Sequence, residues 1–237
     1  MDNEAHNRYF PYLSEVRKRV FFTVSVFFIS CILGFVYYEK IISFALNIFR
    51  FQGVNYVFTS PFQFLDLSVN TAIVVGLVIT FPLFLWQLIS FIRPALTPRE
   101  FKMIIYGLPI SFVLFFAGFG FGLLIMKSVI ELFYQKSIEL SLGNLLDVSK
   151  ILSQTLLTGV LMGIAFQFPI VLSLLIQLKI LKRSILEKNR VMAYMVSIVF
   201  AALMPPTDIL SLILLTLPLV ILFELTLVLN RFLGKRK

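Results

Sequence analysis

Two acidic residues, Glu15 and Glu100, stand out because each lies among basic residues in a polar segment beside a long apolar stretch. A carboxylate can accept charge-assisted hydrogen bonds from a guanidinium group, often as a bidentate pair. The two acids could therefore receive arginine side chains from another molecule. Glu100 also has a simpler explanation. It follows Pro94 and Pro98 at the expected start of a helix, where the helix dipole stabilises an acid by about 0.3–1 kcal/mol. Both explanations stay open on the sequence alone.

Inside the apolar stretches polar residues are few, and two of them are candidates for a function. Glu224 is the only carboxylate there, and Gln167 lies near the middle of the fourth stretch. Ionised groups within a membrane are costly and usually functional, and an amide there needs a partner on another helix. For Glu224 the alternatives are a structural polar contact and a functional one. For Gln167 they are a structural link between helices and the binding of a polar guest.

The elements that must position these residues are six apolar runs, which we predict to be transmembrane helices of a single all-α membrane domain covering residues 1–237. Four runs reach the length of about 20 residues that a bilayer requires, and the first falls just short. The fifth has only 14 residues. The predicted spans are 20–38, 67–89, 103–126, 151–178, 191–204 and 209–229.

The basic residues alternate between the polar segments. Sixteen of the 21 Lys and Arg residues fall in segments 1–19, 90–102, 179–190 and 230–237, and only five fall in the other three segments. Basic loops stay on the cytoplasmic side of a membrane. We therefore predict that both termini are cytoplasmic and that the number of spans is even. The short fifth run must then cross, joined to the sixth by a tight turn at 205–208.

Composition excludes several classes of protein. With 59% apolar residues, 14% charged residues and a mean hydropathy of +0.95, the chain is typical of an integral membrane protein. Orientation accounts for the net charge of +9, so we expect no nucleic acid partner. The predicted spans contain no His or Lys that could serve as a base, and no catalytic or metal-binding motif occurs. We expect no enzyme activity, no cofactor and no metal.

Prolines and glycines within the spans predict the shape of the bundle. A proline removes a backbone donor and bends its helix, so four of them favour a concave molecule over a compact one. They are Pro82, Pro109, Pro169 and Pro218. Glycines at short spacing favour close helix packing. They form the patterns Gly118-x-Gly120-x-Gly122 and Gly159-xxx-Gly163.

Five segments, taken in order, carry a family resemblance. They are Leu13-Ser14-Glu15-Val16-Arg17-Lys18-Arg19; Phe81-Pro82 with Gln87 and then Phe91 to Glu100; Gly163-Ile164-Ala165-Phe166-Gln167-Phe168-Pro169; Pro205-Pro206-Thr207-Asp208; and Pro218-Leu219 with Phe223-Glu224. Each is only moderately specific, but together they cover nearly the whole chain. The chain resembles the TatC family, the multi-spanning subunit of the twin-arginine (Sec-independent) protein translocase.

The resemblance implies a receptor for the twin-arginine signal peptides of folded export substrates. It also implies that the proton-motive force drives their export. It implies the single-span partners TatA and TatB, a homo-oligomer within the translocase, and the inner (plasma) membrane as the location. Carried over from the family, Glu15 and Glu100 would face the paired arginines. Arg17, Phe91 and Pro94 would shape the site.

Two further positions carried over from the family are Gln167, before the proline of the fourth span, and Asp208, after the fifth. Gln63 and Gln167 stand where the family often has an acid, so a carboxylate role at these two positions is open. The main alternative is a secondary transporter of a small solute, with Gln154, Gln167 or Glu224 at a mid-membrane site. A third reading is a membrane adaptor without a substrate.

Overall fold

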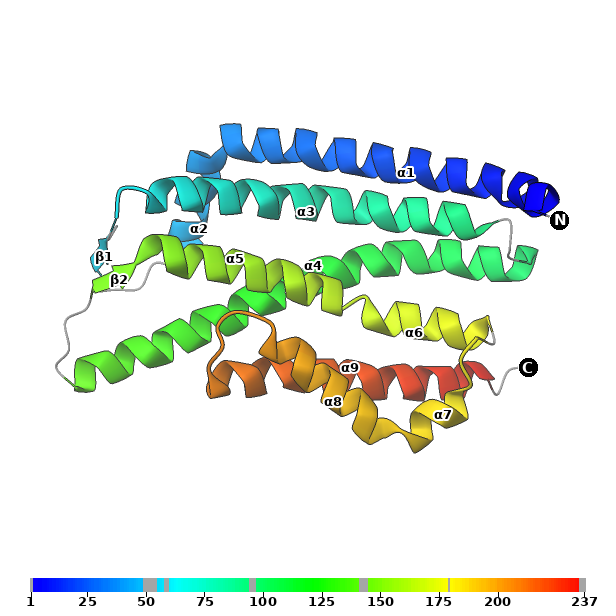
Figure 1. Ribbon diagram of the computed structural model, residues 1–237. Helices are drawn as coiled ribbons and strands as arrows, with labels where there is room; N and C mark the ends of the chain where they lie inside the picture. The colour runs from blue at the N-terminus through cyan, green and yellow to red at the C-terminus, as the bar shows by residue number, and fades with distance from the viewer. Residues whose placement is uncertain are drawn as a thin grey trace.

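The computed structural model describes residues 2–48, 55–57, 60–93, 97–140, 145–178 and 180–234 of the chain. The elements follow one another in the order shown in Figure 1. They are α1 (Asp2–Val36), α2 (Tyr38–Ile48), β1 (Asn55–Val57), α3 (Gln63–Ile92), α4 (Pro98–Glu139), β2 (Leu145–Asp147), α5 (Val148–Ala165), α6 (Phe168–Gln177), α7 (Arg183–Lys188), α8 (Arg190–Ala202) and α9 (Ile209–Gly234).

The described residues contain five helical stretches that are long and apolar enough to cross a membrane. They are Ser14–Val36, Gln63–Phe91, Ile105–Glu139, Val148–Ile176 and Ile209–Arg231. Helix α8 is apolar but shorter, with 13 residues, or about 20 Å of helix. The predicted all-α membrane fold is confirmed, with its fifth apolar helix the short one. Two three-residue strands, β1 and β2, pair in parallel and were not predicted.

The N-terminal part of α1 and the C-terminal end of α9 lie at one end of the molecule, which we call the terminal end (Figure 1). The end of α3, the start of α4, the end of α6 and the start of α7 lie toward the same end. Helix α2, the two strands and the connection from α8 to α9 lie at the opposite end. The described parts of the four segments rich in Lys and Arg therefore lie toward one end of the bundle.

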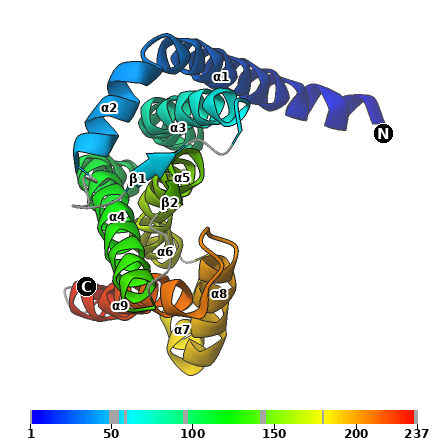
Figure 2. The same ribbon diagram turned by 90° about the vertical axis from the view of Figure 1, so that its left-hand side faces the viewer.

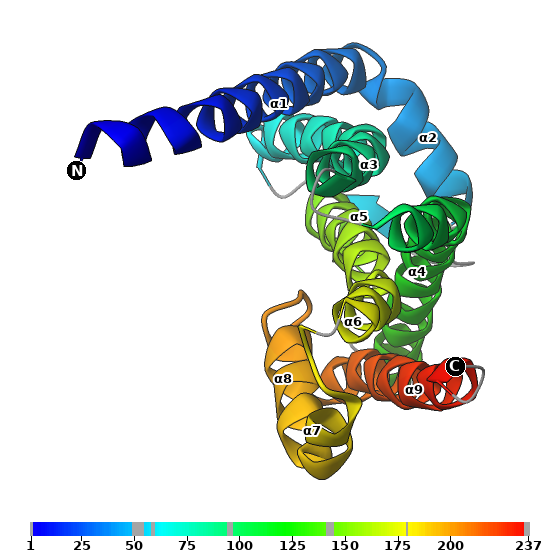
Figure 3. The ribbon, with the colours of Figure 1, turned by 90° about the vertical axis from the view of Figure 1, so that its right-hand side faces the viewer.

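The helices form a curved layer rather than a closed bundle, which confirms the predicted concave shape. Helix α1 packs on α3, α3 on α5 and α5 on α4, while α6 packs on α9 and α9 on α8. Helix α8 and the N-terminal part of α1 project to the same side of this layer (Figures 2 and 3). The layer thus has a concave and a convex side.

Most helices extend beyond the predicted spans, and α1 begins at Asp2 instead of Val20. The predicted span 151–178 is divided between α5 and α6, because the helix breaks at Phe166 and Gln167 and restarts with Pro169 in its first turn. Helix α4 continues 13 residues beyond the predicted end at Met126. Its charged residues interrupted the apolar run, but neither proline nor glycine occurs between Gly122 and Gly143 to stop a helix.

The prolines act in different ways. Pro82, Pro109 and Pro218 lie inside continuous helices, and only Pro169 stands at a helix break. Helix α4, which contains Pro109, bends visibly along its length (Figure 1).

Glycines bring α4 and α5 close together. A Cβ atom at Gly118 would lie 2.6 Å from the Met162 carbonyl oxygen, and one at Gly122 would lie 2.9 Å from the Cα atom of Gly159. A Cβ atom at Gly120 would have nothing within 4 Å. The predicted close packing therefore uses only two of the three glycines in the pattern 118–122, because Gly120 faces away from α5.

Candidate functional site

Glu15 lies on α1 near the terminal end and is already engaged by Arg19, one helical turn further along. The Arg19 side chain donates to Oε1 of Glu15 from Nη2 at 2.6 Å and from Nε at 3.0 Å. The side chains remain 24% exposed for Arg19 and 41% for Glu15. Both bonds end on Oε1, so Oε2 of Glu15 accepts no hydrogen bond from the described residues.

The same arginine also reaches across to α3. Nη1 of Arg19 lies 3.1 Å from Oε1 of Gln87 and 3.2 Å from the Gln87 carbonyl oxygen. All three guanidinium nitrogens thus have acceptors, on two helices. This cluster was not predicted from the sequence. The Glu15–Arg19 spacing of four residues was a usable signal for their pairing, but nothing local points to Gln87.

Of the other residues expected at the site, the structure describes the side chains of only two. Phe91 is half-buried near the end of α3, and Arg17 is exposed on α1. Pro94 lies outside the described residues, as does the side chain of Glu100, whose backbone belongs to the first turn of α4. The start of α4 lies at the terminal end together with the N-terminal part of α1 (Figure 1).

A cation–π contact joins the two helices that flank the loop. The guanidinium carbon of Arg93 lies 4.9 Å from the centre of the Phe101 ring. Such a contact at an exposed site contributes about 0.5–1 kcal/mol. It links the last residues of α3 to the beginning of α4.

Gln167 is buried, with 4% of its surface exposed. Its Nε2 donates to the Ser111 carbonyl oxygen at 3.1 Å and to the Gly163 carbonyl oxygen at 3.4 Å, and its Oε1 accepts from the Ser111 hydroxyl. Both amide hydrogens are therefore used. This geometry favours the structural alternative for Gln167, a link between α4 and the junction of α5 with α6. It also argues against Gln167 as a small-solute site, because both of its amide hydrogens are engaged within the chain.

Glu224 on α9 bonds to two residues of α8. Its Oε1 accepts from the Tyr194 hydroxyl at 2.5 Å, and its Oε2 accepts from Nη1 of Arg190 at 3.2 Å. The carboxylate keeps 32% exposure. The polar contact between the two helices balances the negative charge, although the side chain remains accessible.

Asp208 caps the N-terminus of α9. Its Oδ1 accepts from the Ser211 backbone N–H at 2.8 Å, and its Oδ2 accepts from the Ser211 hydroxyl at 2.6 Å. An N-cap of this kind satisfies a backbone donor that the helix leaves unpaired. The turn before it also packs on α5, since the Thr158 hydroxyl donates to the Pro205 carbonyl oxygen.

Gln63, which stands at a position often acidic in the family, pairs with an acid at the opposite end of the molecule. Its Nε2 donates to Oδ2 of Asp147 at 2.7 Å, and its backbone carbonyl oxygen accepts from the Ser149 hydroxyl at 2.9 Å. Asp147 also caps α5 by accepting from the Lys150 backbone N–H. The carboxylate of this link thus comes from Asp147, a residue that the sequence analysis did not single out.

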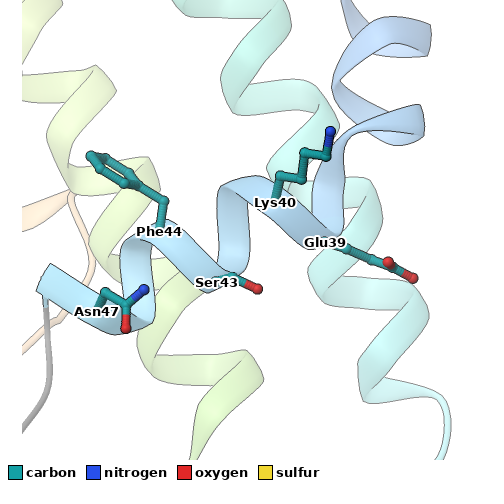
Figure 4. Close-up of a pocket in the computed structure, with 5 residues that line it drawn as sticks. All are labelled: Glu39, Lys40, Ser43, Phe44 and Asn47. Carbon is teal, nitrogen blue, oxygen red and sulfur yellow. The ribbon is translucent and has the colours of Figure 1, made fainter.

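Other hollows on the surface offer less chemistry. One is lined by Glu39, Lys40, Ser43, Phe44 and Asn47 (Figure 4). All five lie on α2 and point in different directions, so the described residues give this hollow no opposing wall. Another, between α4 and α9, is lined only by leucine and isoleucine. Within the described residues no three His, Cys, Asp or Glu side chains are placed to hold a metal.

Comparison with known proteins identifies the family. The family described as Sec-independent protein translocase protein (TatC) matches residues 11–218. The chain belongs to the TatC family. It is 30% identical over 231 residues to the Sec-independent protein translocase protein TatCy of Bacillus subtilis (strain 168), covering 93% of this chain and 87% of that protein. It is 28% identical over 229 residues to TatC of Carboxydothermus hydrogenoformans, covering 96% and 94%.

Two solved structures have the same fold. A crystal structure described as the twin arginine translocase receptor TatC in DDM matches with a TM-score of 0.82 at 26% identity, over 92% of this chain and 98% of that one. A second TatC crystal structure matches with a TM-score of 0.79 at 27% identity. The resemblance seen in the sequence is therefore confirmed. The protein is a multi-pass membrane component of the TatC type, which functions in Sec-independent protein translocation.

Proposed function

We propose that this TatC-family protein is the signal-peptide receptor and core subunit of a twin-arginine translocase. In this role it exports folded proteins with TatA- and TatB-type partners and the proton-motive force. The observation that carries the proposal is Glu15, a half-exposed carboxylate with one free oxygen at the basic end of the molecule. It is supported by the fold match to proteins described as twin arginine translocase receptors. A translocation subunit of this kind needs no catalytic residue and no cofactor.

The proposed orientation places the terminal end in the cytoplasm and the molecule in the inner (plasma) membrane. Support comes from the four basic segments, which resist transfer across a membrane and whose described parts lie toward this end. The signal peptide of a cytoplasmic cargo protein would then meet the end that carries Glu15 and the start of α4.

In the proposed complex Glu15 and Glu100 accept hydrogen bonds from the paired arginines of the signal peptide. A guanidinium group presents its donors in a planar fork that fits a carboxylate, whereas an ammonium group is a single charged point. Arg17, Phe91 and Pro94 would shape the surrounding surface, with the half-buried Phe91 offering an apolar contact at the end of α3. This division of roles would make an Arg-Arg peptide bind better than a Lys-Lys peptide.

Partner subunits would contact the protein within the membrane, and copies of the chain would associate in the working translocase. Of the polar residues expected at such contacts, Glu224 and Asp208 keep partly exposed side chains, while Gln167 is buried. We therefore assign partner contacts to Glu224 and Asp208 and an internal role to Gln167.

The charge reversal Glu100→Lys tests the receptor role. Replacing an acceptor by a like charge should lower cross-linking of an Arg-Arg signal peptide to a photoreactive residue at position 91 by about tenfold or more. Glu100→Ala should have the same effect in milder form. Membrane insertion should be unchanged, and a Lys-Lys peptide serves as the control for background cross-linking. Undiminished cross-linking of the Arg-Arg peptide to the Glu100→Lys protein would refute the role.

A further inference from the structure

The cluster at the terminal end already holds one guanidinium group, that of Arg19. Its Nε and Nη2 donate to Oε1 of Glu15 at 3.0 and 2.6 Å, and its Nη1 donates to the two oxygens of Gln87 at 3.1 and 3.2 Å. Glu15 and Gln87 therefore form a set of acceptors with the shape of an arginine fork. We call this set the guanidinium seat.

We propose that Arg19 occupies, in the free protein, the guanidinium seat that one arginine of the signal peptide takes on binding, so that Arg19 is a resident competitor of its own ligand. This inference rests on the proposed receptor function and adds a regulation to it. Glu15 is then the shared acceptor, and Gln87, which the sequence placed only within a family segment without a role, becomes a specificity-determining residue.

The contact between Arg19 and Glu15 is of a kind that exchanges easily. Both side chains are partly exposed, and their charges are one helical turn apart on a single helix. Exposed pairs of this spacing contribute little to stability, because water screens them and two long side chains must be ordered. Since Oε2 of Glu15 is free of bonds from the described residues, an incoming arginine can bind there before Arg19 leaves.

The seat also separates arginine from lysine. Its acceptors engage three different nitrogens, which lie in one plane in a guanidinium group. A lysine offers one nitrogen at the end of a flexible chain and cannot bond to Glu15 and Gln87 in the same way. With Arg19 in place, a ligand must bind better than the resident arginine does. A Lys-Lys peptide competes poorly with Arg19, so the affinity difference between Arg-Arg and Lys-Lys peptides is larger than it would be at an empty seat.

The test measures the affinity of the purified full-length protein for an Arg-Arg signal peptide before and after Arg19→Gln. Removal of the competitor should raise the affinity by about fivefold, the size expected when a weak exposed pair and its added hydrogen bonds are lost. Lys18→Gln is the matched control, because it removes the same charge from the neighbouring exposed residue. It should change the affinity by less than about twofold.

The outcomes distinguish a competitive role of Arg19 from a purely structural one. If Arg19 only holds α1 against α3, Arg19→Gln will lower or preserve the peptide affinity, and the inference is overturned. An equal rise with Lys18→Gln overturns it as well, since net charge then explains the gain. Arg19→Lys decides the matter if the glutamine variant does not fold. It keeps the charge but cannot fill the seat, so it should raise the affinity by about twofold.

Gln87 is tested in the Arg19→Gln background, where no competitor obscures its effect. There Gln87→Leu should lower the Arg-Arg affinity by about fivefold and leave the Lys-Lys affinity nearly unchanged. An equal loss of affinity for both peptides would show that Gln87 is not part of the guanidinium seat. If the unaltered protein binds no Arg-Arg peptide at all, the receptor function itself fails, and that result is distinct from a failure of the competition.

Discussion

Two polar clusters join helices in this protein, and they differ in their access to water. The first is the guanidinium seat with Arg19, at the terminal end between α1 and α3, whose ion pair is 24% and 41% exposed. The second, which we call the buried clasp, consists of Gln167, Ser111 and the Gly163 carbonyl, and its central glutamine is 4% exposed. The first is charged and leaves an acceptor free, whereas the second is neutral and uses both of its amide hydrogens.

The difference shows how burial assigns a polar group to folding or to binding. A buried polar group must be satisfied within the chain, because leaving it unpaired costs about 1–3 kcal/mol. A partly exposed pair has water as an alternative partner, so it can open at little cost. The buried clasp therefore suits a fixed contact between helices, and the guanidinium seat suits exchange with a ligand. Three substitutions test this contrast, in order of their expected effect on the unfolding free energy.

The largest effect is expected next to the buried clasp, at Gly118. In Gly118→Ala the new methyl group would lie 2.6 Å from both the Met162 carbonyl oxygen and Cγ of Phe166. Overpacking of this kind costs about 1–3 kcal/mol. Gly120→Ala is the matched control, because a Cβ atom there meets nothing within 4 Å. Unfolding in detergent should reveal a clear loss of stability for Gly118→Ala alone, and similar values for the two variants would contradict the close packing of α4 on α5.

A smaller effect is expected within the buried clasp itself. Gln167→Leu removes the acceptor of the Ser111 hydroxyl and both amide donors, so it should lower the unfolding free energy by about 1–2 kcal/mol. Signal-peptide affinity should stay the same, because the clasp shares no residue with the guanidinium seat and joins other helices. A variant that kept its stability but lost peptide binding would show that Gln167 takes part in binding. The contrast between a structural clasp and a binding seat would then be wrong.

The smallest effect on stability is expected at the guanidinium seat. Glu15→Gln keeps the size of the side chain and removes its charge, so the unfolding free energy should change by less than about 0.5 kcal/mol. Affinity for the Arg-Arg peptide should nevertheless fall by about tenfold, because a charge-assisted acceptor is lost. Peptide titration and unfolding of the same sample measure both quantities. Joint loss of stability and affinity would mean that Glu15 serves folding as much as binding.

Much of the architecture was predictable because it depends on local or additive properties of the chain. The lengths of the apolar runs predicted the membrane helices, and the distribution of Lys and Arg predicted termini at one end. The predicted helix bounds were wrong where a local sequence feature was misinterpreted. The charged residues beyond Met126 suggested a loop although α4 continues to Glu139, and the break before Pro169 was predicted only as a bend.

The candidate site was less accessible to sequence reasoning. Glu15 was recognised as a carboxylate among cations, but its engagement with Arg19 was not drawn from their spacing. Asp208 was recognised through the family, while its cap on Ser211 is a local contact three residues away. Signals of this short range can be read from a sequence when they are sought.

By itself the sequence determined the class of the protein, its number of apolar helices, the gathering of its basic segments and its family. Only the tertiary structure decided which polar residues meet: Arg19 with Gln87 across 68 residues, and Gln167 with Ser111 across 56. It also decided that Gly118 faces α5 while Gly120 faces away. The physical reason is that such contacts depend on the rotation and approach of whole helices, which many weak packing contacts set together.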